Sequence, residues 1–153
     1  MNLKKEMSTS EIGEFLKNKN DFVKIDYLIR FLHEKIPADV RRFVFLKLGE
    51  VYERSSMFVD SGRAYEKAIE LSNEKDKKNV SIKAAQAMIR AGDFNRADEL
   101  IRNVMSKASD FERKDVVNGL KTFYLYTAEM HEKTRKLGEA LKIYERVLTT
   151  MNI

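Results

Sequence analysis

A repeat of 36 residues runs through most of this 153-residue chain. Each copy has a pair of neighbouring residues and, nine positions after the second of them, a large apolar residue. The copies are Ile12-Gly13 with Phe22, Leu48-Gly49 with Phe58, Ala84-Ala85 with Phe94 and, after a step of 43, Thr127-Ala128 with Leu137. A fixed period of about 20 to 50 residues is typical of stacked repeats, which present an extended surface to a partner. The period therefore predicts a stack of similar units and favours a binding role.

Composition narrows the class of protein. Hydrophobic residues make up 43% of the chain and charged residues 35%, as in a well-solvated folded protein. One proline and six glycines argue against a sheet with many tight turns. No apolar run is long enough for a membrane span, and the first eight residues lack the apolar core of a secretory signal. With no cysteine there is no disulfide framework and no thiolate metal site, and we expect a cytoplasmic protein.

The net charge of +5 is spread over mixed stretches rather than gathered in one basic run. Lysine and arginine alternate with acids in 74–78 and 110–115, so the charges of these segments nearly cancel. Mixed runs of this kind are usual at solvated helix ends and in loops. Because a nucleic-acid surface is typically more one-sided, the charge pattern favours a protein partner over RNA or DNA.

Apolar residues recur at helical spacing nearly throughout the chain. Phe45, Leu48, Gly49 and Tyr52 follow the i, i+3, i+4, i+7 rule of a helix with one buried face. We predict helices at 8–18, 22–35, 38–54, 58–73, 78–91, 94–107, 111–133 and 137–151. The turns inside the predicted hairpins fall at 17–21, 54–57, 91–93 and 134–136. The extra residues before the fourth copy should lengthen its first helix by about two turns.

The second copy carries the fullest pattern of the repeat. It reads Phe45-x-x-Leu48-Gly49-x-x-Tyr52, followed by Ser61-x-x-x-Tyr65-x-x-Ala68. The other copies keep parts of it: Ile12-Gly13-x-x-Leu16, Gly92-Asp93-Phe94-x-x-Ala97, and Ala128 with Ala140, Tyr144 and Val147. This pattern resembles the tetratricopeptide repeat, with phenylalanine in place of its tryptophan, Ser61 in place of its alanine and Asn73 in place of its closing proline. The resemblance covers nearly the whole chain.

The resemblance implies an all-α fold, a right-handed α–α superhelix of four helical hairpins. It implies one domain over 1–153, with repeats at roughly 6–37, 42–75, 78–109 and 111–153. The small residues Gly13, Gly49, Ala85 and Ala128 are expected where paired helices approach closely. Phe58, or Leu137 in the fourth copy, is expected to fill the space beside them.

No set of residues indicates an enzyme. The two histidines, His33 and His131, belong to the first and fourth copies and are expected to lie far apart in a stack. His131 stands where the second copy has Tyr52, which favours a position in the core. No His-x-x-x-His pair, glycine-rich phosphate loop or nucleophile elbow occurs. We therefore expect no catalytic residue, no metal and no cofactor.

The first helix of each predicted hairpin has a second stripe of residues outside its packing face. The stripe comprises Phe43, Leu46, Glu50 and Glu53 in the second copy, Ile82, Gln86 and Ile89 in the third, and Leu125 and Glu129 in the fourth. The resemblance implies that these residues line a concave groove, with an apolar floor and glutamates around it. Burial of the same apolar residues between neighbouring first helices is the alternative, and the sequence leaves both open.

Some members of that family hold a C-terminal carboxylate with a clamp of lysine, asparagine and arginine in the groove. The matching positions here are Ser10, Glu14, Lys47, Asn79 and Lys83. Only fragments of the clamp remain, and Glu14 opposes an anion. We expect instead a ligand with apolar anchors and some positive charge, either an amphipathic helix or an extended segment.

Three functions fit these patterns. The leading hypothesis is a non-catalytic protein-interaction scaffold or adaptor that binds its partner in the concave groove. The second is a nucleic-acid or ribonucleoprotein accessory factor, based on basic residues near the turns inside the hairpins. These residues are Lys17, Lys19, Arg54, Arg90, Arg96, Lys133, Arg135 and Lys136. Cations at these places also suit the carboxyl ends of helices without any ligand. The third is a structural homo-oligomer.

The last predicted helix has more apolar surface than one contact needs, because its apolar residues span an arc of about 160°. Packing against its hairpin partner is expected to cover Ala140, Tyr144 and Val147. We expect Leu141, Leu148 and Met151 to remain exposed and either to self-associate, most simply as a two-fold dimer, or to dock a partner.

Overall fold

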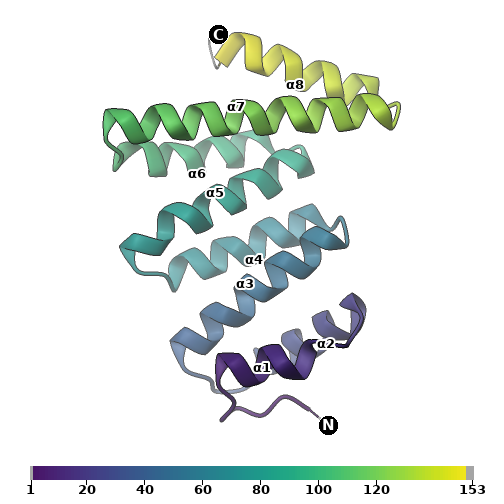
Figure 1. Ribbon diagram of the computed structural model, residues 1–153, viewed down its shortest axis with the longest axis vertical. Helices are drawn as coiled ribbons and strands as arrows, with labels where there is room; N and C mark the ends of the chain where they lie inside the picture. Colours follow the sequence, from purple (N-terminus) through teal and green to yellow (C-terminus); the bar gives the residue numbers. More distant parts are fainter. Residues whose placement is uncertain (1, 151–153) are drawn as a thin grey trace.

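A computed structural model describes residues 2–150, and these residues form eight helices (Figure 1). The helices are α1 (Thr9–Leu16), α2 (Asp21–Phe31), α3 (Ala38–Arg54), α4 (Phe58–Glu70), α5 (Glu74–Ala91), α6 (Phe94–Ser106), α7 (Asp110–Lys133) and α8 (Leu137–Thr150). The described residues contain no strand, so the all-α prediction is confirmed. Each described boundary lies within four residues of the predicted one. The largest shifts are at the end of α2 and at the start of α5, where Asn73 caps the helix by accepting from the Asp76 amide.

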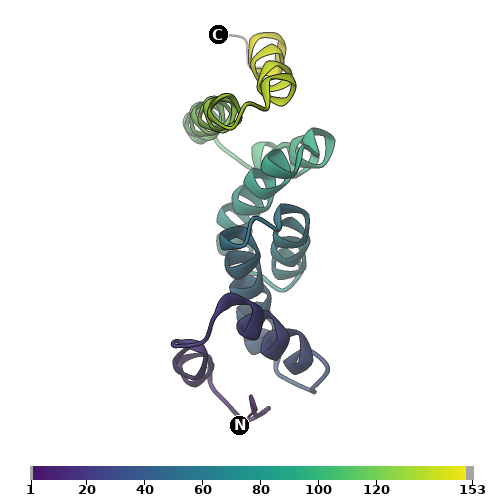
Figure 2. The ribbon, with the colours of Figure 1, turned by 90° about the vertical axis from the view of Figure 1, so that its right-hand side faces the viewer.

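The helices pair along the long axis of the molecule. α3 packs against α4, α5 against α6 and α7 against α8, and α4 also packs closely against α5. The first helices α1, α3, α5 and α7 form one layer, and α2, α4, α6 and α8 form the other (Figure 2). In Figure 2, α1 and α7 lie further to the left than α3 and α5. The layer of first helices is therefore bowed.

The same turn joins the two helices in three of the hairpins. Ser56, Gly92 and Arg135 stand at one position of the repeat and have left-handed φ values of 58°, 83° and 64°. In each turn the next residue donates its amide to a carbonyl five residues earlier: Met57 to Tyr52 at 2.8 Å, Asp93 to Met88 at 2.9 Å and Lys136 to His131 at 2.7 Å. This bond belongs to the Schellman motif, which satisfies the last carbonyls of a helix. The sequence repeat is thus also a repeat of backbone geometry.

The close approach predicted at Gly49 is present between α3 and α4. A Cβ atom added at Gly49 would lie 2.5 Å from the nearest ring atom of Tyr65, closer than real Cβ contacts allow. The Ser61 hydroxyl, buried at the same interface, donates to the Gly49 carbonyl at 2.8 Å. Burial, with Glu53 and Glu50 nearby, raises the pKa of Tyr65 well above its usual value. Gly49 therefore makes room for an aromatic ring of the neighbouring helix.

The close approach of paired helices that was also predicted at Gly13 is absent. A Cβ atom added there would meet nothing within 4 Å. The reason is that α1 and α2 meet through large side chains: the rings of Phe15 and Tyr27 are 5.1 Å apart, edge to face. Ala85 and Ala128 are fully buried, as expected of a packed position.

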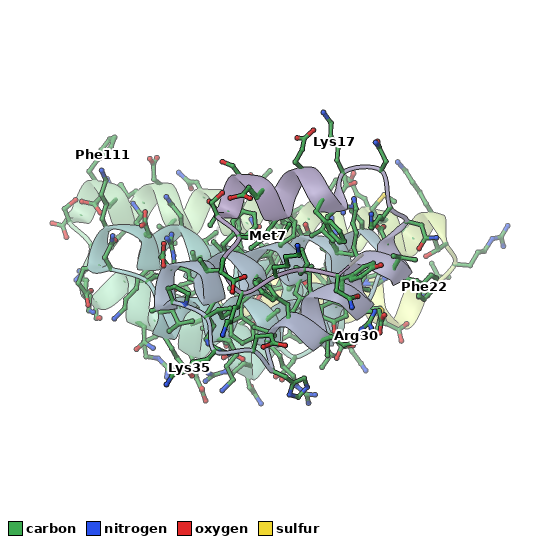
Figure 3. All side chains as sticks on the ribbon, turned by 90° about the horizontal axis from the view of Figure 1, so that it is seen from below. Met7, Lys17, Phe22, Arg30, Lys35 and Phe111 are labelled. Atoms are coloured by element: carbon green, nitrogen blue, oxygen red, sulfur yellow. The ribbon has the colours of Figure 1, made fainter. Side chains whose placement is uncertain are left out.

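The large apolar residue of the repeat was predicted to fill space between the helices, and it does so in only two of the four copies. Phe58 and Phe94 are partly buried, and Phe94 packs against the core. Phe22 is 80% exposed and Leu137 is also exposed, so neither fills space between helices. Both lie at an end of the stack, where fewer neighbouring helices are available to cover them (Figure 1). Phe22 and Phe111, another exposed phenylalanine, project at opposite edges of the molecule (Figure 3).

The first helix of the fourth hairpin is longer than its counterparts, as predicted. α7 has 24 residues, whereas α3 has 17 and α5 has 18. The difference is about two turns at 3.6 residues per turn. The extra length extends α7 along the whole width of the stack (Figure 1).

Equivalent ion pairs connect successive first helices. Arg42 of α3 contacts Asp76 of α5 at 3.2 Å, and Lys78 of α5 contacts Glu112 of α7 at 3.5 Å. The second pair is the first one displaced by 36 residues. Exposed pairs of this kind contribute little stability, about 0–1 kcal/mol. Their recurrence indicates that the two junctions share one register.

Two clusters of buried side chains form the core. The N-terminal cluster comprises Ile12, Leu16, Leu28, Phe31, Ile36, Val40, Val44, Leu48 and Ala64. The C-terminal cluster comprises Tyr65, Ala68, Val80, Ala84, Ala85, Ala87, Met88, Ile89, Ala97, Leu100, Val104, Val116, Leu120, Tyr124, Ala128, Ile143 and Val147. The clusters meet at α4, where Ala64 and Tyr65 are neighbours, and Phe45 packs against both.

Candidate functional site

The predicted groove stripe lies mainly in half-buried positions. Leu46, Ile82 and Leu125 pack against the C-terminal cluster, and Phe43 packs against the N-terminal cluster. The polar members Glu50, Glu53 and Gln86 are half-buried, and Glu129 is exposed. Ile89 is only 1% exposed and belongs to the C-terminal cluster, so its assignment to the groove surface is corrected. It is buried because α5 packs against α4, α6 and α7.

One acidic group of the stripe, Glu50, has an ion-pair partner within the chain. Lys47 contacts Glu50 at 3.4 Å, and the Lys47 ammonium also lies 5.7 Å from the centre of the Phe43 ring. On the fourth hairpin a hydrogen bond to Glu132, with Glu129 nearby, raises the pKa of Tyr144. The stripe is therefore interrupted by internal contacts and does not present a continuous row of free glutamates.

The exposed apolar face predicted for the last helix is present on α8. Leu137, Leu141 and Leu148 are 63%, 58% and 72% exposed, while Ala140, Ile143 and Val147 are buried on the opposite side. Arg146 holds α8 to the rest of the stack through an ion pair with Asp98 of α6. Met151, the third residue predicted for this face, lies outside the described residues.

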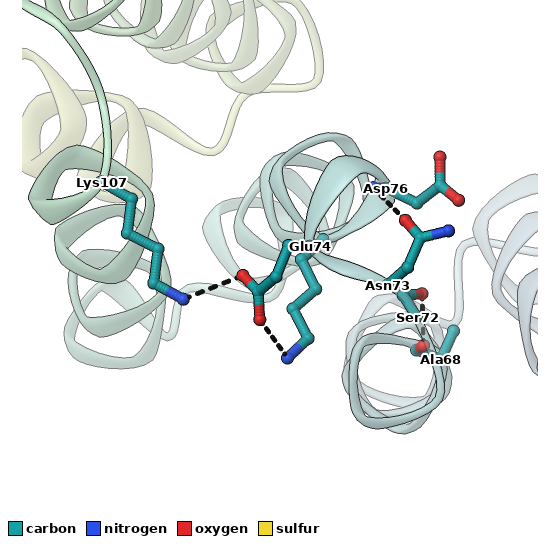
Figure 4. A network of polar contacts seen from close by, with 7 residues as sticks. Ala68, Ser72, Asn73, Glu74, Asp76 and Lys107 are labelled. Atoms are coloured by element: carbon teal, nitrogen blue, oxygen red, sulfur yellow. Dashed lines mark hydrogen bonds and ion pairs between the residues drawn. The ribbon is translucent and has the colours of Figure 1, made fainter.

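A hollow of about 520 Å³ lies at the edge formed by the loops that join successive hairpins. Its apolar wall includes Ile69, Leu100 and Val104, and lysines and glutamates surround it. Glu74 of α5 contacts Lys107 of α6 at 3.1 Å and Lys77 at 3.1 Å (Figure 4). Hydrogen bonds from these two lysines lower the pKa of Glu74. Glu74, Lys77, Lys78, Lys107 and Glu112 are paired inside the chain, and the exposed Lys75 is the one charged lining residue without an ion pair among the described residues.

The opposite edge has a hollow around Arg90, which we call the Arg90 hollow. Its volume is about 320 Å³, and its lining residues are Phe58, Arg90, Tyr126, Thr127, Met130 and His131. The guanidinium carbon of Arg90 lies 5.3 Å from the centre of the Phe58 ring and 5.5 Å from that of Phe123. Cation–π contacts of this length hold the guanidinium between α4 and α7. Tyr126 and Met130 are 50% and 40% exposed, so the apolar wall of the hollow is open to solvent.

A second hollow of about 420 Å³ adjoins the first, because both are lined by Arg90 and His131. Its charged lining residues are Arg90, Lys136 and Lys142, with Glu139 as the one carboxylate. The two hollows together combine an apolar wall with an excess of positive charge. This combination suits a ligand that carries both a negative charge and an apolar group.

Sequence analysis alone did not identify this site. It assigned His131 to the core, whereas His131 is half-buried and lines both hollows; His33 is exposed at the far end of the stack. Tyr126 was also missed, although it occupies the repeat position of Lys47 and Lys83. The other copies have Glu11, Lys47 and Lys83 at this position, so an aromatic residue in a column of charged residues is the signal that marks this place.

Residues 2–150 offer neither a metal site nor a membrane span. No group of three or more metal-ligating side chains is gathered there. None of the described helices has both the length and the apolar character needed to cross a membrane. Comparison with family models, with curated protein sequences and with solved structures finds no match.

Proposed function

We propose that this chain is a non-catalytic protein-interaction scaffold built as a right-handed superhelix of four tetratricopeptide-like hairpins. Support comes from the recurrent turn at Ser56, Gly92 and Arg135 and from the contact of Gly49 with Tyr65. The equivalent ion pairs between successive first helices add a regular stacking register. A regular stack of this kind is suited to presenting side chains from several units to one partner.

The single observation that carries the proposal is the exposed row on α8. Leu137, Leu141 and Leu148 are exposed, and the half-buried Tyr144 lies between the last two, so the four residues follow one another at intervals of four, three and four. This is the spacing at which apolar residues form the seam between two packed helices. A contiguous exposed apolar surface marks an interface, and this spacing specifies a helix as its partner.

A second copy of α8 is the simplest helix that fits this row. Lys142 and Glu145 are exposed and of opposite charge, three residues apart on one side of the row. In an antiparallel two-fold pair, the lysine of one copy can face the glutamate of the other, so like charges are not brought together. The proposed scaffold is therefore a homodimer that joins two stacks through their α8 helices.

Sedimentation velocity at micromolar concentrations tests the dimer. We expect a dimer for the unmodified chain and a monomer of unchanged helicity for Leu141→Glu with Leu148→Glu, because buried carboxylates would disrupt the seam. Ile29→Glu with Val59→Glu makes the same chemical change at exposed positions elsewhere and should remain dimeric. A monomeric unmodified chain over the whole range would contradict the dimer. A photo-crosslinker at position 141 would then show whether α8 joins to a different protein, which the scaffold proposal requires.

The nucleic-acid alternative receives less support from the basic turn residues. Arg54 contacts Asp21 at 3.2 Å, Arg96 is paired with Glu66 and Glu99, and Arg90 lies over two rings. These cations are engaged within the chain and do not form a free one-sided patch. A salt series with generic RNA checks this point, since affinity that rests on phosphate contacts falls steeply as salt rises.

A further inference from the structure

We propose that Arg90 and the Arg90 hollow dock a peptide segment in which a carboxylate side chain neighbours a large apolar one. The inference rests on the proposed scaffold function and specifies one of its partners. It involves the edge of the stack at the carboxyl ends of α5 and α7, and from α8 the side that bears Glu139 and Lys142 rather than the exposed leucines. The test is accordingly separate from that of the dimer.

Arg90 contacts aromatic rings but has no carboxylate partner among the described residues. Its side chain is half-buried, and its guanidinium lies over the rings of Phe58 and Phe123. Within residues 2–150 no carboxylate lies at ion-pair distance from this guanidinium, whereas Arg42, Arg54, Arg96 and Arg146 each have one. A guanidinium has five N–H donors that suit a carboxylate, and the contacts with ring faces do not satisfy them.

The equivalent arginine of the preceding repeat, Arg54, does have a carboxylate partner. Arg54 and Arg90 occupy the same repeat position, 36 residues apart, at the carboxyl ends of α3 and α5. Arg54 contacts Asp21, the first residue of α2, at 3.2 Å. The residue 36 positions after Asp21 is Met57, which precedes α4 and carries no charge. The chain thus supplies a carboxylate to Arg54 but not to Arg90, and a carboxylate from a partner can take that role.

The Arg90 hollow has an apolar wall beside the guanidinium. Phe58, Tyr126 and Met130 line the hollow beside Arg90, and the last two are exposed although large. A volume of about 320 Å³ accommodates an apolar side chain of leucine or phenylalanine size. The flexible thioether of Met130 can adapt to either shape. The site therefore selects an apolar residue next to the acid.

Positive charge predominates around the site. In the adjoining hollow Lys136 and Lys142 outnumber the one carboxylate, Glu139. Further acidic residues of the bound segment would be attracted there, which favours a segment that is acidic overall. An acidic segment differs from the sequence-based expectation, which was a ligand with some positive charge because of the glutamates on the first helices. The unpaired cation lies at the hairpin edge, whereas Glu50 of the predicted stripe is paired with Lys47.

An array of random octapeptides, probed with the full chain, tests the site. We expect the retained peptides to be enriched in aspartate or glutamate beside leucine, isoleucine, phenylalanine or methionine. Affinity for the best peptide should fall at least about tenfold in Arg90→Gln, because one charge-assisted contact is lost. Arg63→Gln removes the same charge from an exposed position on α4 and should change affinity less than about twofold.

Met57→Asp tests the internal comparison. The new carboxylate stands where Asp21 stands relative to Arg54, so we expect it to pair with Arg90 and to weaken peptide binding at least about tenfold. Met57→Asn provides the same shape and can also cap α4, but it has no charge, and it should bind like the unmodified chain. Thermal unfolding by circular dichroism establishes that each variant is folded before binding is compared.

Each result decides the proposal. Loss of binding in Arg90→Gln and Met57→Asp, with retention in both controls, supports it. Retained peptides without acids, binding unaffected by Arg90→Gln, or no retained peptide would each overturn it. Preferential binding of single-stranded RNA that depends on Arg90 would also overturn it, because the site would then be one for phosphate. If the peptide tests contradict the docking site but the chain still dimerises through α8, the scaffold function remains supported.

Discussion

Gly49 and Gly13 occupy the same position of the repeat, yet only Gly49 lies against a neighbouring side chain. Its Cα approaches the ring of Tyr65 so closely that an added Cβ would be 2.5 Å from a ring carbon, whereas Gly13 faces open space. The difference follows from what each neighbouring helix contributes. Tyr65 lies across α3, but α1 and α2 are held apart by the Phe15 and Tyr27 rings. The same residue type therefore has opposite consequences in two copies.

Substitution at these two glycines tests the contrast. Gly49→Ala should lower the free energy of unfolding by about 1–3 kcal/mol, because Tyr65 must move, and Gly49→Leu should cost more. Gly13→Ala should raise it by about 0.5–1 kcal/mol, since alanine favours the helix and meets no neighbour. Urea unfolding followed by circular dichroism measures both. An unchanged midpoint in Gly49→Ala would show that the two helices are not in close contact there.

The recurrent left-handed residue shows how one geometry is made by different side chains. Gly92 adopts φ of 83° without steric cost, whereas Ser56 and Arg135 adopt similar values with a Cβ atom. The Schellman bonds at 2.8 Å and 2.7 Å that follow Ser56 and Arg135 satisfy helix carbonyls at the same place. Hydrogen bonding therefore offsets local strain in these turns.

At the scale of the element, α3 and α8 present apolar residues to different surroundings. Phe43 and Leu46 of α3 are half-buried against the two core clusters. Leu141 and Leu148 of α8 have no helix beyond them among the described residues and are more than half exposed. Similar apolar stripes thus become part of the core or a free face according to which elements flank them.

Replacing Phe43 and Leu46 with alanine separates a groove role from a core role. Because both pack on buried clusters, we expect each change to lower the free energy of unfolding by about 1–3 kcal/mol, less than at a fully buried site. Glu50→Gln and Glu53→Gln, on the same helix, serve as controls with little expected effect on stability. If the double alanine variant keeps its stability but loses a bound helical partner, the residues belong to a binding groove instead.

At the scale of the whole molecule, the core is divided along the stack. The N-terminal cluster joins α1, α2 and α3 with Ala64 of α4, and the C-terminal cluster extends from α4 to α8. In a stack of units, stability is approximately the sum of each unit and its contacts with its neighbours. A local defect is therefore expected to open one end of the molecule before the other.

Hydrogen exchange measured by mass spectrometry tests this division. Leu28→Ala, in the fully buried centre of the N-terminal cluster, should cost about 2–5 kcal/mol and accelerate exchange in α1–α3 while α7 and α8 keep their protection. Ile143→Ala, equally buried in the C-terminal cluster, should have the mirror effect. Equal acceleration throughout the chain in either variant would show that the stack unfolds as a single cooperative unit.

Much of the architecture was predictable because it depends on local rules. The helical spacing of apolar residues predicted the eight helices, and the step of 43 residues predicted the longer α7. The exposed face of α8 was predictable for the same reason, since the arc of apolar residues on one helix can be counted. Each of these features is a property of one segment and its immediate neighbours.

Tertiary structure decided which repeated positions are buried and where charges remain without a partner. Ile89 belongs to the core because α5 packs against α4, α6 and α7, and Gly13 faces open space because α1 and α2 do not approach closely. Arg54 and Arg90 have the same repeat position, but only Arg54 meets a carboxylate. Burial and pairing depend on distances between segments that are far apart in the chain, and a periodic pattern records the repeat without recording those distances.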